Sequence, residues 1–412
     1  MNFTKNFFLV FISVFLLTGC DKVDEKTLYR TKVPIYEKMS TIRSQGVSVR
    51  APQNIEDFGK IYLYQDYLFI NEPQKGIHIY DNSNPKQPFA VSFLNIPGNV
   101  DMAVKDNILY ADSYVDLLSF DLSNPTNPIL KNRNEEVFAS EYTYDHNTKS
   151  VKSIVLGYVD TMMNYEQIRS YSPYIKPNIL SENYSSDNSS YGQGGSMARF
   201  TLAKDYLYTV DDKSLNLFDV SISSKPVFKK NVALDWGIET IFPYKNNLFI
   251  GSNNGMYIYN IDKPAEPVQL SRYAHLRACD PVVVNDKYAF VTLRSGAMCG
   301  GVHNVLEVIN IENLRDPKLI KSYQMQHPHG LGLYNNILYL CEGDFGFKSY
   351  DVSDVTKIDD QLVEHFATQK SIDVIVGPKS IIVIGKDGVC QYDYSDNKKL
   401  KLLSCVDLLQ VH

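Results

Sequence analysis

Residues 76–85 read GIHIYDNSNP, a short alternating segment that ends in a cluster of turn-forming residues. Alternation of apolar Ile77 and Ile79 with their neighbours is typical of a β-strand, and the Asp-Asn-Ser-Asn-Pro run that follows is typical of a turn. The short side chain of Asp81 is suited to bond the backbone two residues on and to start the turn that Pro85 completes. We therefore assign Asp81 a structural role rather than a catalytic or metal-binding one.

This strand and its closing residue recur seven times along the 412-residue chain. The closing residues are Asp81, Asp121, Asp219, Asn260, Asn310, Asp351 and Asp393. Successive copies are about 40 residues apart, with one interval of 98 residues. That interval contains residues 139–195, a stretch rich in Ser, Tyr and Asn, and without its 57 residues the interval is 41. The sequence thus keeps one period and carries one long insertion.

Each period contains four strand-like segments separated by polar turns, for example residues 101–105 and 108–112 before the motif that ends at Asp121. A single four-stranded unit of this kind leaves both of its faces uncovered, whereas closing the units into a ring covers them. The 29 tyrosines and the 44% hydrophobic content favour sheet and a large core. The sequence predicts an all-β protein, a seven-bladed β-propeller of four-stranded antiparallel blades over residues 55–412.

Longer blocks resemble the LVIVD-repeat bacterial lipoproteins over residues 33–412. These blocks are residues 76–85, 96–102, 194–201, 278–287, 291–297 and 327–335. The resemblance implies a β-propeller in an anchored, extracytoplasmic location, and it implies no established enzymatic reaction. Asn260 and Asn310 replace the signature aspartate, which argues against a metal site carried by the repeats.

The amino terminus has the pattern of a lipoprotein signal. Its apolar run of about eleven residues, 7–17, follows Lys5 and is shorter than the roughly 20 residues that a membrane-spanning helix needs. Leu17-Thr18-Gly19-Cys20 resembles the lipobox of bacterial lipoproteins. We expect a signal peptide at 1–19, lipidation of Cys20 and a tether over 20–54; a plain signal peptide with a chance cysteine is the alternative. The expected location is the cell envelope, as an outer-membrane lipoprotein on either its surface-exposed or its periplasmic side.

The charge balance excludes one class of partner. The chain has 41 Lys and Arg against 47 Asp and Glu, a net charge of −6, without an extended basic run. Nucleic acid binding requires a concentrated positive surface, so we do not expect nucleic acid as a partner. The expected partners are the membrane, through the lipid, and an envelope protein or glycan.

A ligand face is predicted where the innermost strands begin. The first-strand starts are Arg199, Glu239, Asp280, His329 and Asp373, with Asp101 one step away, and the turns on the same face carry Glu72, Asp212, Arg294, Glu342 and Asp344. The insertion at 139–195 and the enlarged loop at 295–304 are expected on this face, and long loops on a rigid scaffold often carry recognition. These polar residues are either the solvated lining of the channel mouth or a binding site.

Five cysteines remain beyond Cys20, and thiols outside the cytoplasm tend to pair. We expect disulfides between Cys279 and Cys299 and between Cys390 and Cys405, with Cys341 as a buried thiol. A nucleophilic role is not expected for Cys279, because its neighbour Asp280 has the wrong charge to stabilise a thiolate.

The function predicted from these features is a lipid-anchored binding or scaffolding module for a protein or glycan. The alternative is an extracytoplasmic hydrolase or lyase that uses Asp280, Glu239, Asp373 and His329 at the channel mouth. A zinc ion held by His327, His329 and Asp280 is a further hypothesis, although such a pair more often reflects a turn before a polar strand. We expect no cofactor, no metal and no catalytic residue.

Overall fold

The computed structural model describes residues 28–138, 142–145, 150–164, 167, 193–275, 281–296 and 303–406. It divides into two compact units, one with residues 1–37 and 155–177 and the other with 38–154 and 178–412. Three strands form one sheet in the order β1-β12-β11: β1 (Tyr29–Lys38), β12 (Ser150–Met163) and β11 (Tyr142–Asp145). Most of β1 and the second half of β12 belong to the first unit.

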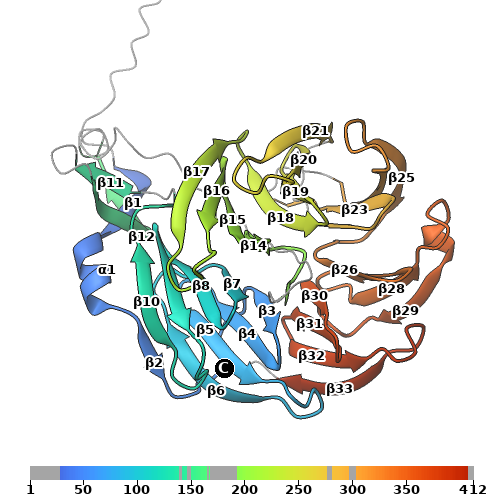
Figure 1. The fold of residues 1–412 in the computed structure, drawn as a ribbon, viewed down its shortest axis with the longest axis horizontal. Helices are drawn as coiled ribbons and strands as arrows, with labels where there is room; N and C mark the ends of the chain where they lie inside the picture. Colours follow the sequence, from blue (N-terminus) through green and yellow to red (C-terminus); the bar gives the residue numbers. More distant parts are fainter. Residues whose placement is uncertain are drawn as a thin grey trace, which may run out of the picture. The chain divides into compact units, whose positions relative to one another are not determined.

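The second unit contains seven four-stranded antiparallel blades (Figure 1). Blade 1 consists of β3 (Ile61–Tyr64), β4 (Tyr67–Glu72), β5 (Gly76–Asp81) and β6 (Phe89–Asn95). Blade 2 consists of β7 (Met102–Lys105), β8 (Ile108–Ser113), β9 (Asp116–Asp121) and β10 (Ile129–Asn134). Blade 3 consists of β14 (Phe200–Ala203), β15 (Tyr206–Asp211), β16 (Ser214–Asp219) and β17 (Val227–Ala233). Blade 4 consists of β18 (Ile238–Tyr244), β19 (Asn247–Ser252), β20 (Gly255–Asn260) and β21 (Val268–Ala274). Blade 5 consists of β22 (Val282–Val284), β23 (Tyr288–Leu293), β24 (Val305–Asn310) and β25 (Lys318–Gln324). Blade 6 consists of β26 (Leu331–Tyr334), β27 (Ile337–Cys341), β28 (Phe347–Asp351) and β29 (Leu362–Phe366), with the 3-10 turn η1 (Ile358–Asp360) before β29. Blade 7 consists of β30 (Asp373–Val376), β31 (Ile381–Gly385), β32 (Gly388–Asp393) and β33 (Lys401–Val406).

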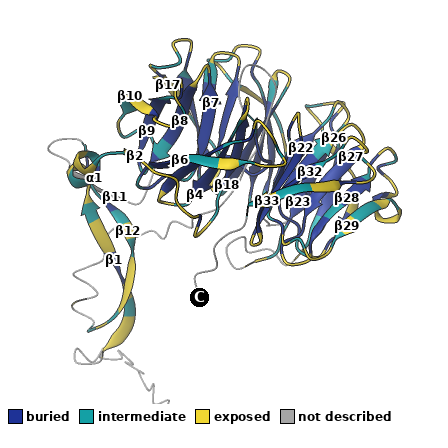
Figure 2. Cartoon of the chain, turned by 90° about the horizontal axis from the view of Figure 1, so that it is seen from below, coloured by how far each residue is buried: buried dark blue, intermediate teal, exposed yellow. Residues whose placement is uncertain are grey.

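The first strands of the blades line the centre of this unit. They contact one another in a closed cycle, β3-β7-β14-β18-β22-β26-β30 and back to β3. All four residues of β7 are buried, whereas the residues of β10, the outermost strand of the same blade, are exposed or half-buried (Figure 2). Apolar side chains of adjacent blades pack between the sheets, as expected when each blade covers the faces of its neighbours. The prediction of an all-β, seven-bladed propeller is confirmed.

The residue that closes each third strand performs the turn-forming role inferred from the sequence. Asp81 Oδ1 accepts a hydrogen bond from the backbone N–H of Ser83 at 2.9 Å. The same bond, to the N–H two residues on, is made by Asp121, Asp219, Asn260, Asn310, Asp351 and Asp393, at 2.8 to 3.1 Å. Asparagine serves as well as aspartate because only a side-chain acceptor oxygen is needed.

Blade 7 packs directly on blade 1 and closes the ring. The four strands of each of these blades come from one continuous stretch of chain, so neither blade combines strands from the two ends. The side chains of Asn82 and Gln391, both buried, exchange two hydrogen bonds of 3.2 and 2.6 Å. Ser404 Oγ donates to the carbonyl of Pro85 at 2.6 Å, as Ser92 Oγ donates to the carbonyl of Pro125 between blades 1 and 2. The closing interface is therefore built in the same way as an internal one.

Part of the segment expected to be a tether is structured. The strand β2 (Ser48–Arg50) pairs with β6 and extends blade 1 outward. The helix α1 (Met39–Gln45) buries Met39 and Ile42, and its Arg43 donates to both oxygens of the fully buried Asp116 at 2.9 and 2.8 Å. These contacts hold residues 39–50 on the second unit. Asp116 also accepts from Arg133 Nη1 at 2.7 Å, so two arginines share the pairing of its buried charge.

One disulfide is present among the described residues. Cys390 and Cys405 lie opposite each other on β32 and β33 and are bonded. Cys341 is a free, buried cysteine, and burial raises the pKa of its thiol. Cys279 and Cys299 lie outside the described residues, so their pairing stays a prediction.

We expect Gln391→Leu to lower the free energy of unfolding by about 1–3 kcal/mol, because the buried amide of Asn82 and the buried hydroxyl of Ser380 would both lose their partner. Urea denaturation of the full chain measures this change. Gln87→Leu, at an exposed position in a turn, is the matched control. Equal effects of the two substitutions would show that the Asn82–Gln391 contact does not hold blades 1 and 7 together.

Candidate functional site

A short strand crosses the centre of the ring. The strand β13 (Gln193–Gly194) pairs antiparallel with β3, with Gln193 opposite Leu63 and Gly194 opposite Tyr62. The chain therefore runs from the side where the first strands end towards the side where they begin. Residues 194–198, the crossing segment, are buried. We expected all of residues 139–195 on the side where first strands begin; instead, the last residues of this insertion lie inside the channel, where they satisfy the open edge of β3.

The crossing segment contacts Asp373 closely. Ser196 Oγ donates to Asp373 Oδ1 at 3.2 Å and accepts from the Leu331 N–H at 2.7 Å. A Cβ atom at Gly195 would lie 1.8 Å from Asp373 Oδ2, and one at Gly330 would lie 2.0 Å from its Oδ1. Only glycine fits at these two positions without displacing the carboxyl group. Asp373, predicted at the channel mouth, is fully buried beneath this segment.

Two other predicted residues, Asp101 and Arg199, lie where the crossing segment joins β14. Asp101, which is buried, accepts from the backbone N–H groups of Arg199 and Phe200 at 2.5 and 3.2 Å. The Arg199 guanidinium lies 3.4 Å from Asp212 Oδ1. The buried Lys60 donates to the Met197 carbonyl at 3.4 Å. Polar residues on this side of the ring thus bind the chain's own backbone.

Burial changes the protonation of these carboxyl groups. It raises the pKa of Asp373 to about 8 and also raises the pKa of Asp101, against the opposing influence of Lys60 and of backbone hydrogen bonds. Asp373 is consequently protonated at neutral pH. Its Oδ2 atom is buried and has no hydrogen-bond partner, which is less costly for a neutral carboxyl than for a carboxylate.

The predicted acids of the inter-strand turns form local ion pairs. These pairs are Glu72 with Lys75, Glu342 with Lys348, and Asp344 with Lys386. Glu72 is also hydrogen-bonded to His78 at 2.8 Å, and burial lowers the pKa of that histidine. Glu239 is buried and Arg294 is half-buried. Asp280 and most of the loop at 295–304 lie outside the described residues, so their place in the predicted face stays untested.

The two histidines of this region lie together. His329 Nε2 is 3.1 Å from His327 Nδ1, and the backbone N–H of His329 donates to the Cys341 carbonyl. Burial, with a smaller effect of Arg294, lowers the pKa of His329 to about 2, so the ring is neutral. Within the described residues, no three His, Cys, Asp or Glu side chains are placed to hold a metal ion. The zinc hypothesis depends on Asp280 and remains a hypothesis.

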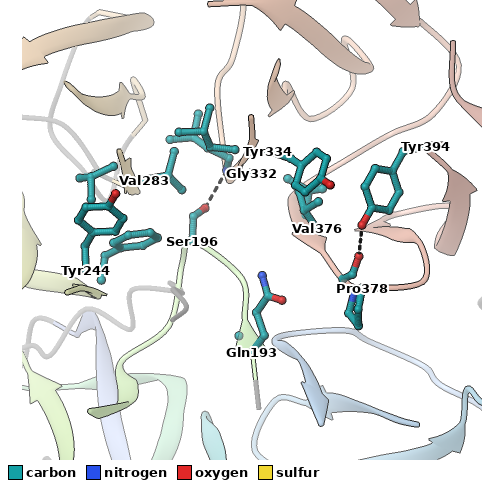
Figure 3. Close-up of a pocket in the computed structure, with 16 residues that line it drawn as sticks. Gln193, Ser196, Tyr244, Val283, Gly332, Tyr334, Val376, Pro378 and Tyr394 are labelled. Atoms are coloured by element: carbon teal, nitrogen blue, oxygen red, sulfur yellow. Dashed lines mark hydrogen bonds between the residues drawn. The ribbon is translucent and has the colours of Figure 1, made fainter. Parts of the chain in front are cut away.

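A cavity of about 370 Å³ opens on the opposite side of the crossing segment, where the first strands end (Figure 3). Its wall comes from β13, β18, β22, β26 and β30 and includes Phe242, Val283, Val284, Leu331, Leu333, Val374 and Val376. Tyr244, Tyr334, Tyr394 and Gln193 add polar atoms at its edges. No lining residue carries a charge. Pockets of this size and character are typical of small-ligand or side-chain binding.

A second hollow adjoins this cavity at Tyr334, Pro378 and Tyr394. It continues outward between blades 6 and 7 and is also lined by Asn335, Lys379, Asp393, Ser395 and Asn397. The rings of Tyr334 and Tyr394 meet edge to face at 5.1 Å, and the Tyr394 hydroxyl donates to the Gly377 carbonyl at 2.7 Å (Figure 3). The border between the two hollows is therefore fixed by packing and by a hydrogen bond.

Comparison with protein families identifies the repeats. The family model described as LVIVD repeat matches residues 98–135 and 194–233. The chain contains LVIVD repeats. The matches cover blades 2 and 3, each with the loop that leads into its first strand. Residues 194–199 are accordingly part of an LVIVD repeat, and the first two of them are also the end of the insertion.

Solved structures share the fold of this LVIVD-repeat propeller. Sqt1 of Saccharomyces cerevisiae has a TM-score of 0.51 at 9% sequence identity, covering 92% of this chain and 90% of that chain. BamB from Moraxella catarrhalis has a TM-score of 0.49 at 8% identity, with 88% and 96% covered, and Hsv2 of Kluyveromyces lactis has 0.46 at 9%, with 85% and 100% covered. The likeness to Sqt1, at 9% identity, shows the fold alone. No curated protein is significantly similar in sequence.

Gly195→Ala in the LVIVD-repeat propeller should lower the free energy of unfolding by about 1–3 kcal/mol, because the added methyl group overlaps Asp373. Thermal and urea denaturation measure this. Gly296→Ala is the control, since a Cβ atom there meets nothing within 4 Å. An unchanged stability for Gly195→Ala would contradict the close packing of the crossing segment.

The stability of the chain should depend on the protonation of Asp373. The pKa of Asp373 is about 8 in the folded state, against roughly 3.9 in an unfolded chain, so its contribution is full below pH 4 and is lost as pH rises towards 8. Asp373→Asn removes this loss, and its stability relative to the native chain should grow by up to ~1.4 kcal/mol per pH unit between these limits. Parallel stability–pH curves from urea denaturation would contradict the assignment.

Proposed function

We propose that the protein is a binding module whose ligand inserts an uncharged group, with both apolar and hydrogen-bonding surface, into the central cavity. The observation that carries this proposal is the cavity lining, which combines apolar residues of four blades with tyrosine hydroxyls and one amide. A charged group would lose its hydration there without gaining a partner, so the cavity selects against it. The apolar part of an uncharged group gains stability by leaving water, and its polar atoms meet the tyrosine hydroxyls and the Gln193 amide.

The ligand that fits best is a segment of a partner protein. Tyr244, Tyr334 and Tyr394 offer broad rings with polar tips, and tyrosine supplies contact area at a low cost in conformational entropy. The adjoining hollow between blades 6 and 7 has amide, hydroxyl and charged groups suited to the polar backbone on either side of an inserted side chain. A glycan is the competing ligand, and it would use the same rings and amides.

The proposed setting is the cell envelope. Support comes from the apolar run at 7–17 and from the lipobox-like residues ending at Cys20, which together favour a lipid-anchored outer-membrane protein. Within the described residues, no helix has the length and apolar character needed to cross a bilayer. Lipidation is tested by the mass of the amino-terminal peptide of the native chain, in which Cys20 should carry diacylglycerol.

The described residues give the hydrolase or lyase alternative no support, and its Asp280 lies outside them. Glu239 is 5% exposed, His329 is 7% exposed and Asp373 is fully buried. The crossing segment separates Asp373 from the cavity, and His329 is neutral and bonded to His327. These side chains therefore have no open surface for a substrate, and the geometry favours binding.

The cavity is tested with the uncharged fluorophore N-phenyl-1-naphthylamine. We expect the native chain to bind it, and Leu333→Asp or Val376→Asp to reduce the affinity by about tenfold or more, because each places a carboxylate in the apolar wall. Val268→Asp, on the exposed outer strand β21, is the control.

Melting curves establish that all three variants are folded. Equal affinities for the native chain and for the two cavity variants would overturn the proposed site. Capture of envelope proteins with the same variants then separates the two ligand classes: loss of one protein in both cavity variants identifies a protein ligand, whereas a glycan array signal lost in both identifies a sugar.

A further inference from the structure

The strands β1 and β12 of the first unit expose many apolar side chains. Among the described residues, eight of the twenty-two exposed large apolar side chains belong to this unit, although it contributes only residues 28–37, 155–164 and 167. They are Leu28, Tyr29, Ile35, Tyr36, Leu156, Tyr158, Val159 and Met162. Soluble surfaces rarely carry so dense an apolar patch unless something binds it.

One ion pair indicates how these side chains are divided between the two faces of the strands. Arg30 donates to Asp160 at 3.0 Å, so these two residues lie on the same face of the two strands. Side chains alternate along a strand, and the residues at even spacing from Arg30 and Asp160 share that face. This ribbon face contains Leu28, Arg30, Lys32, Pro34, Tyr36, Leu156, Tyr158, Asp160 and Met162, of which Pro34 is buried. Tyr29, Ile35 and Val159 lie on the opposite face.

The chemistry of the ribbon face matches a bilayer surface. Leu28, Leu156 and Met162 are about half exposed and supply the apolar part. Two tyrosines supply amphipathic rings of the kind enriched where hydrocarbon meets headgroups. Arg30 and Lys32 outnumber the single Asp160, which leaves a cationic excess suited to anionic headgroups.

The position of the ribbon in the chain favours the same partner. Leu28 is eight residues after Cys20. Eight residues reach at most about 29 Å when fully extended, so a lipid on Cys20 keeps the ribbon within that distance of the bilayer. This step rests on the lipidation of Cys20 advanced under the proposed function.

We propose that the ribbon face lies on the lipid surface, as a second membrane contact beside the lipid on Cys20. The acyl chains supply most of the membrane affinity, and the ribbon supplies a contact that fixes how the first unit lies on the bilayer. The ligand class is a phospholipid bilayer that contains anionic headgroups.

The test separates the ribbon from the lipid by using the mature chain with Cys20→Ser, which cannot be acylated. Its flotation with vesicles of phosphatidylethanolamine and phosphatidylglycerol is compared with that of the same chain carrying Leu28→Ser, Leu156→Ser and Met162→Ser. The matched control carries Val268→Ser, Leu319→Ser and Leu402→Ser, three exposed positions on the outer blade strands β21, β25 and β33.

We expect the Cys20→Ser chain and the control to float with the vesicles. The partition coefficient of the ribbon variant onto the vesicles should be lower by about tenfold or more, because three apolar side chains no longer leave water. No flotation of the Cys20→Ser chain, or equal flotation of the ribbon variant, overturns the proposal. Dimers that the ribbon variant abolishes, without a change in flotation, would assign this face to a second copy instead. Absence of lipid on Cys20 in the native chain is a separate result, since it removes the anchor without affecting this comparison.

Discussion

The structure depends on one constraint: a four-stranded blade has two apolar faces and buries neither alone. Seven blades meet this constraint by packing in a closed cycle, so that each blade covers the next. The side-chain bond from each third-strand Asp or Asn to the backbone two residues on makes this possible. It starts the turn that brings the fourth strand back beside the third, and it is the same in all seven blades.

Closure of the ring creates a channel, and the chain fills one side of it with its own residues. The segment 194–198 enters along β3, and its close approach to Asp373 requires glycine at positions 195 and 330. Buried polar residues on that side, Asp101 and Lys60 among them, are used to hold the segment rather than to meet a ligand. The open cavity consequently lies on the other side, where the wall is uncharged.

The repeats made the propeller predictable, because a period of about 40 residues with a fixed closing residue specifies strand, turn and blade together. The crossing strand was not predictable, since Gln193 and Gly194 have neither apolar alternation nor β-forming residues. The cavity was equally hidden, because Val374 and Leu333 look like any core residues of a strand. Spacing placed Glu342 and Asp344 on one face but gave no information on their lysine partners, which come from neighbouring strands and turns.

The central claim is that ligands enter the uncharged cavity and not the polar side of the ring. A crystal structure of the full chain with N-phenyl-1-naphthylamine tests this most directly. The account predicts density for the fluorophore beside Leu333, Val376 and Tyr334, with the crossing segment in place. Density among Arg294, Asp344 and His329, or a displaced crossing segment with the fluorophore against Asp373, would contradict it.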